Sequence, residues 1–106
     1  MLFELRRYEL RPGTRADWVN LFETAIVPFQ VAKGMVVIGS FTAENEPDVF
    51  FWIRRFDSED ERVRLYDAVY KDPEWTGQIK PRIDTMLIRE TMQITRLNPT
   101  PRSVLR

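Results

Sequence analysis

Two runs of β-branched and aromatic residues, separated by only four polar residues, constrain the fold of this chain more than any other feature. The first run covers residues 35–43 (MVVIGSFTA) and the second covers residues 48–56 (DVFFWIRRF). The segment between them, 44–47, reads Glu-Asn-Glu-Pro, which is typical of a turn. Two strands joined by so short a loop predict an antiparallel hairpin.

One further strand is predicted at each end of the chain. Residues 2–10 (LFELRRYEL) mix aromatic and aliphatic with long polar side chains, and the Pro-Gly pair at 12–13 ends this run. Residues 86–97 (MLIRETMQITRL) alternate apolar and polar side chains and predict the last strand.

Helical periodicity is found in the two long gaps between predicted strands, the first before residue 35 and the second after residue 56. In the first gap an apolar stripe runs to Pro28, where we expect a kink or an early end because proline lacks a backbone donor. In the second gap Ser58 and Glu61 form a capping box, and Asp72 begins a further helix. The predicted buried faces are Trp18, Leu21, Phe22, Ala25, Ile26 and Phe29 in the first gap, and Val63, Tyr66, Val69, Tyr70, Trp75, Ile79 and Ile83 in the second.

The resulting order, β-α-β-β-α-β, predicts the ferredoxin-like α+β fold: a four-stranded antiparallel sheet with helices on one face. A length of 106 residues fits one domain, 1–106. Residues 98–106 contain two prolines and are expected to form a C-terminal arm.

Composition excludes several kinds of chemistry. The chain has no cysteine and no histidine, which removes disulfides, thiolate nucleophiles and the usual ligands of zinc and haem, so we expect no metal and no cofactor. Sixteen basic and sixteen acidic residues give no net charge, so no nucleic-acid partner is expected. No apolar run is long enough to span a membrane, and the charged N-terminal segment does not resemble a signal peptide, so we expect a cytoplasmic protein.

The strand at 48–56 is apolar on both of its faces, although helices are expected to cover only one. Val49, Phe51 and Ile53 alternate with Phe50 and Trp52. An uncovered apolar sheet face is unusual in a soluble monomer, so we expect a homodimer in which two sheets face each other. The alternative cover, the C-terminal arm, is too short and too polar to cover four strands.

Four motifs occur in the same order as in a known family: E-L-R-R-Y with Pro-Gly at 4–13, K-G-M-V-V-I-G-S-F at 33–41, D-P-E-W at 72–75 and P-T-P-R-S at 99–103. Together they resemble the NIPSNAP family, in the dimeric α+β barrel superfamily, over nearly the whole chain. This resemblance implies a ferredoxin-like fold and a homodimer whose two sheets enclose a cavity. It implies no catalytic residues, because bacterial members have no generally established activity.

A polar cluster on the first strand is the candidate site. Glu4, Arg6 and Tyr8 alternate, so they share one face of the strand. If Phe3 and Leu5 face the helices, this trio faces the partner sheet. Arg89 on the last strand and Trp52 on the third are expected to join the trio in lining the barrel cavity; the alternative is an ion pair, capped by the tyrosine, that only holds the dimer together.

Two functions follow from these interpretations. In the first, the barrel cavity binds a small, mostly apolar molecule that carries a carbonyl or a carboxylate, held by arginine and tyrosine. In the second, the chain is a non-enzymatic protein–protein interaction module. An open pocket with convergent polar groups favours the first function, and a cavity packed with side chains favours the second.

Overall fold

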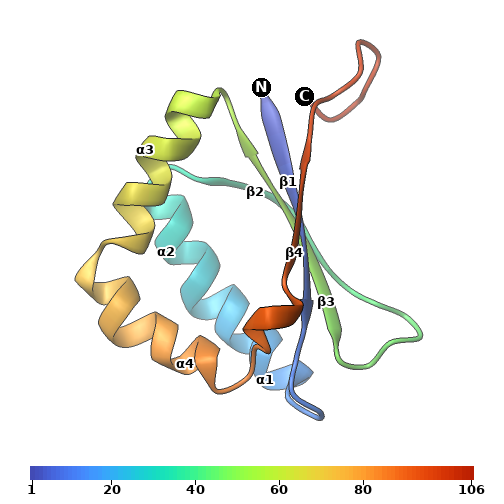
Figure 1. Cartoon of the computed structure of the whole chain (residues 1–106), viewed down its shortest axis with the longest axis vertical. Coiled ribbons are helices and arrows are strands. Elements are labelled where there is room, and N and C mark those ends of the chain that lie inside the picture. Colours follow the sequence, from blue (N-terminus) through green and yellow to red (C-terminus); the bar gives the residue numbers. More distant parts are fainter.

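The four strands form one antiparallel sheet with all the helices on a single face. The computed structural model describes residues 1–106. Its strands are β1 (Leu2–Glu9), β2 (Val36–Thr42), β3 (Val49–Phe56) and β4 (Gln93–Leu97), and their order in the sheet is β2-β3-β1-β4. Figure 1 shows the helices packed on one side of the sheet and nothing on the other. The predicted ferredoxin-like fold is confirmed.

The helical layer consists of two segments of the chain, and each contains a π-helical turn. The first segment consists of α1 (Arg15–Leu21), η1 (Phe22–Ile26) and α2 (Val27–Ala32). The second consists of α3 (Glu59–Tyr70), η2 (Trp75–Ile79) and α4 (Lys80–Asp84), and a short 3-10 turn, η3 (Arg89–Thr91), leads into β4. No helix is long and apolar enough to cross a membrane.

Both π turns end just before a proline, Pro28 or Pro81. Proline removes a backbone donor and crowds the carbonyl one turn earlier. The wider turn accommodates it: the amide of Val27 donates to the carbonyl of Phe22, and the amide of Lys80 donates to that of Trp75. Of the two alternatives predicted at Pro28, a kink or an early end, the early end is wrong, because the chain continues as a helix to Ala32.

The polar trio on β1 faces the helices, which corrects the predicted orientation of this strand. Glu4 and Tyr8 are 1% and 5% exposed. The Tyr66 hydroxyl of α3 donates to Glu4, and the Tyr8 ring contacts Trp18 of α1. Phe3 therefore points the opposite way. The prediction failed because it took the helix layer to be wholly apolar, whereas that layer supplies tyrosine and glutamine partners for the buried charges.

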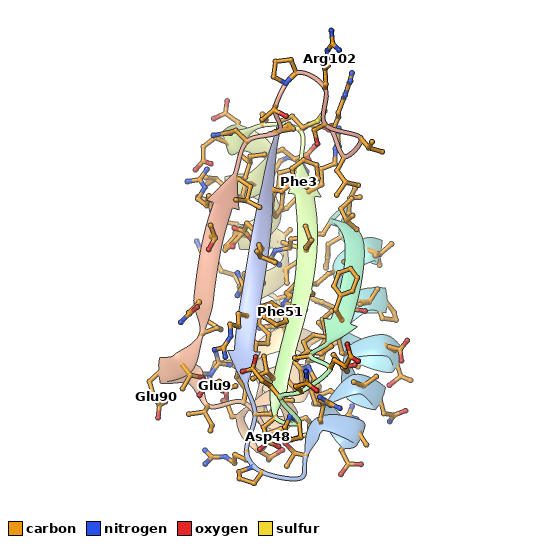
Figure 2. All side chains as sticks on the ribbon, turned by 90° about the vertical axis from the view of Figure 1, so that its right-hand side faces the viewer. Phe3, Glu9, Asp48, Phe51, Glu90 and Arg102 are labelled. Atoms are coloured by element: carbon orange, nitrogen blue, oxygen red, sulfur yellow. The ribbon has the colours of Figure 1, made fainter.

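The face of the sheet that no helix covers, called the bare face below, is apolar along its middle. Figure 2 looks onto it and shows Phe3 and Phe51 toward the viewer. Phe41 is 54% exposed, and its ring lies over Gly39, where an added Cβ would come within 2.9 Å of it. Trp52 is 1% exposed and faces the helices instead, so it does not belong to this face.

β4 is shorter than predicted and the buried face of α3 is shifted, whereas the C-terminal residues have no regular structure, as expected. β4 begins at Gln93 rather than at residue 86, because Leu87 pairs with Leu10 through a single bridge and residues 89–91 form the 3-10 turn. On α3 the buried residues are Leu65 and the predicted Val69, whereas Val63 is 48% exposed. Residues 98–106 form a loop beyond the end of the sheet (Figure 1).

Candidate functional site

A buried arginine connects the sheet to both helical segments. Arg54 on β3 has no exposed surface. Its Nε donates to Glu4 Oε1 at 2.7 Å, Nη1 donates to Gln30 at 3.0 Å and to Tyr70 at 2.7 Å, and Nη2 donates to Tyr66 at 2.8 Å. All three nitrogens of this guanidinium are used within the protein, so Arg54 is a structural anchor.

Arg6, the neighbouring buried arginine, is much less well partnered. Its Nε donates to the Tyr8 hydroxyl at 2.8 Å. Its terminal nitrogens make only long contacts: Nη1 lies 3.5 Å from Glu4 and 3.4 Å from Tyr66, and Nη2 lies 3.9 Å from the sulfur of Met92. Glu4 is the only buried carboxylate in this cluster, so two buried guanidiniums share one negative charge.

The carboxylate that they share stays ionised. Burial alone raises the pKa of Glu4, but the charge of Arg54 and the hydrogen bonds from Tyr66 and Arg54 outweigh it and lower that pKa below its ordinary value. Burial also raises the pKa of Tyr66, and its hydrogen bond to Glu4 acts in the same direction. Tyr66 therefore remains a neutral hydrogen-bond donor to an ionised acid.

A pocket of about 250 Å³ lies between the sheet and the helices. Arg6 lines it together with aromatic residues from both helical segments and from the sheet. All three tryptophans of the chain, Trp18, Trp52 and Trp75, are among its lining residues. The indole nitrogens of Trp18 and Trp52 are buried without a hydrogen-bond partner. Unpartnered buried donors are rare, and here both belong to residues of the pocket.

The two π turns lie along this pocket. Phe22 and Ile26 of η1 line it, as do Trp75 and Thr76 of η2. π-helical turns inside helices occur frequently at functional sites. The signal for them in the sequence is a proline inside a helical pattern, at position 28 and again at position 81.

Comparison with known proteins identifies the family. A NIPSNAP family model matches residues 3–103. The chain belongs to the NIPSNAP family. No protein of established annotation is similar enough to match it.

Solved structures agree with this assignment. A NIPSNAP family protein of unknown function from Agrobacterium tumefaciens superimposes with a TM-score of 0.89 at 24% identity, over 100% of this chain and 94% of the other. A NIPSNAP-like domain protein from Burkholderia xenovorans gives a TM-score of 0.85 at 25% identity, over 96% and 87% of the two chains. An antibiotic biosynthesis monooxygenase gives 0.70 at 14% identity, over 95% and 100%, and shares the fold alone.

The NIPSNAP chain brings four of the five predicted site residues to one pocket. Arg6, Tyr8, Trp52 and Arg89 all line it, and Glu4 lies behind Arg6 in the ion cluster. The pocket is not the predicted space between two sheets, because it lies within one protomer, between sheet and helices. The lining residues that sequence reasoning missed include Trp18, Gln30, Tyr70, Trp75 and Lys80, and the three aromatic residues among them have the helical spacing of ordinary core residues.

The chemistry that the NIPSNAP pocket offers is anion binding by a cation in aromatic surroundings. No group of three or more acidic residues is placed to hold a metal ion. No aspartate or glutamate lines the pocket. Because the Tyr8 oxygen accepts from Arg6, its own proton is free to be donated to a ligand oxygen. Arg6 and Tyr8 together can hold a carboxylate, or a carbonyl that gains negative charge.

Proposed function

We propose that this protein binds a small, mostly apolar molecule with a carboxylate or carbonyl group in the pocket between its sheet and its helices. The observation that carries this proposal is the weakly partnered guanidinium of Arg6, a residue that is only 6% exposed. Arg6 shares its one buried counter-charge, Glu4, with Arg54, which lies closer to it, and a buried cation that is incompletely paired destabilises a protein. An anionic ligand supplies that partner, and Tyr8 supplies the neighbouring donor.

The size of the pocket narrows the ligand class. A dry cavity of about 150 Å³ accommodates one benzene molecule, and drug-sized ligands occupy at least about 300 Å³. A pocket of about 250 Å³ lined mainly by hydrophobic residues therefore matches a single ring, or an equivalent aliphatic group, with a short acidic arm. Phenylacetate is a suitable probe of this class.

Tryptophan fluorescence tests the proposal directly, because every tryptophan of the chain lines the pocket. We expect phenylacetate to change the emission in a saturable manner and phenylacetamide to bind more weakly. Arg6→Gln should raise the Kd for phenylacetate at least about tenfold, since it removes a charge-assisted hydrogen bond.

The matched control is Arg64→Gln, which removes the same charge from an exposed position on α3. This variant should bind phenylacetate like the wild type, and circular dichroism should show that both variants are folded. If no carboxylate of this size binds the wild type, or if Arg6→Gln binds as well as the wild type does, the proposal is wrong.

We also propose a homodimer formed through the bare face. Phe51 and Ile53 on β3 and Phe41 on β2 leave an apolar area that a second copy of the sheet would cover. Charges of both signs accompany it: Arg7 pairs with Glu9 at 3.1 Å on β1. A surface with an apolar middle and mixed charges suits a two-fold contact with itself, which supports a second copy over an unrelated protein partner.

A further inference from the structure

The charges along the pocket are divided between its floor and its mouth. Its three cationic lining residues are Arg6, Lys80 and Arg89. Arg6 lies on the sheet and its side chain is 7% exposed. The side chains of Lys80 and Arg89 are 45% and 42% exposed, and they come from α4 and η3. The floor of the pocket is therefore its sheet side, with the buried cation Arg6, and its mouth is the side where Lys80 and Arg89 are in contact with solvent.

A single carboxylate outside the pocket holds both cations of the mouth. Lys80 Nζ lies 3.0 Å from Asp84 Oδ2, and Arg89 Nε lies 2.6 Å from Asp84 Oδ1. Each oxygen of Asp84 thus takes one cation. Arg89 donates through Nε alone, so its two terminal amino groups keep their donors for another acceptor. Two cations and one carboxylate leave the mouth with one net positive charge.

We propose that the preferred ligand carries two acidic groups, one bound by Arg6 and Tyr8 at the floor and the other by Arg89 and Lys80 at the mouth. This inference rests on the proposed function and adds a specificity to it. The aromatic residues between floor and mouth contact the apolar middle of the ligand. Asp84 acts as a positioning residue, because it fixes the Nε side of Arg89 and leaves the terminal amino groups available.

Two probes that differ by one carboxylate test the inference. 4-Carboxyphenylacetate has an acid at both ends of the ring, and 4-methylphenylacetate replaces the second acid with a methyl group. We expect the first to bind wild-type protein about two- to fivefold more tightly, the range of a partly exposed ion pair. Arg89→Gln should remove most of this preference, because it weakens binding of the diacid by a larger factor than binding of 4-methylphenylacetate.

The matched control is Arg82→Gln, which removes an equal charge from α4 at an exposed position that does not line this pocket. It should keep the preference for the diacid. Equal binding of the two probes to wild type, or equal loss in both variants, overturns the inference and leaves the proposed function standing. Failure of both probes to bind wild type overturns the proposed function as well.

Discussion

Glu4 and Arg54 lie opposite each other on β1 and β3, with the carboxylate 2.7 Å from the guanidinium Nε and both side chains almost fully buried. Replacing Arg54 with methionine leaves Glu4 buried with the hydrogen bond from Tyr66 and, among the buried cations, only the longer contact to Arg6. We expect this change to lower the free energy of unfolding by about 3–5 kcal/mol. Urea denaturation at a fixed protein concentration measures it.

The double variant Glu4→Gln with Arg54→Met should recover part of that loss, because it removes both charges together. Arg55→Met is the positional control, since Arg55 is the next residue along β3, lies on the opposite face and pairs with the exposed Asp57. Its cost should stay below about 1 kcal/mol. A similar loss of unfolding free energy in Arg54→Met and Arg55→Met would contradict the expected large contribution of the buried Glu4–Arg54 pair to stability.

The lowered pKa of Glu4 predicts a pH dependence of stability. A carboxyl whose pKa is lower in the folded state than in the unfolded state stabilises the fold above its unfolded value, and this contribution disappears as the pH falls through the folded pKa. Glu4→Gln should therefore destabilise the protein at pH 7. The difference from wild type should shrink as the pH falls below the ordinary value of 4.5, where protonated Glu4 resembles glutamine. Denaturation midpoints of both proteins from pH 7 to pH 3 measure this, and a constant difference would contradict the assignment.

The proposed homodimer predicts that a charge at the middle of the bare face separates the two copies. Phe51→Glu should give a monomer in sedimentation velocity at micromolar concentration, because two carboxylates would be buried in one contact. Val63→Glu, on the exposed side of α3, should remain a dimer. A wild-type monomer under these conditions would refute the proposal. Trp52 is unsuitable for this test, since glutamate at its core position would unfold the protomer.

Two glycines predict opposite effects of the same substitution. Gly34 has a positive φ of 110°, and an added Cβ would lie 3.3 Å from Leu65, so Gly34→Ala should destabilise the protein by about 1–2 kcal/mol. Gly77 lies in η2 at a negative φ with open space around it, so Gly77→Ala should stabilise by about 0.5–1 kcal/mol. Thermal unfolding of both variants gives the two signs, and the same sign for both would contradict this explanation.

Local sequence patterns were sufficient to predict the elements of the fold. Both helix caps in the second half are confirmed: Ser58 accepts from the amide of Glu61, and Asp72 accepts from that of Glu74. The predicted β4 was too long because the alternating pattern of the sequence extends past the end of β1, the strand with which β4 pairs. In the register that pairs Arg7 with Gln93, residue 88 would face Pro12, beyond the end of β1.

The face on which the site lies could not be predicted in the same way. Alternation shows that Glu4, Arg6 and Tyr8 share a face, but not which face it is. That choice depends on Tyr66, which lies 62 residues from Glu4 along the chain. Its hydroxyl contacts both Glu4 and Arg6. Arg6, Tyr8 and Trp52 were predictable one strand at a time, whereas the helical residues of the pocket and its position required contacts between distant residues.

The strand order has a consequence for how this protein can fold. β1 lies between β3 and β4, so both of its hydrogen-bonded neighbours come from the second half of the chain, and β2 is not beside it. Neither the segment 1–48, with β1 and β2, nor the segment 49–106, with β3 and β4, contains two neighbouring strands of the sheet. The ion pair between Arg54 and Glu4 therefore forms only when the two segments pair. We therefore expect the pocket to form and disappear in the same cooperative transition as the sheet itself.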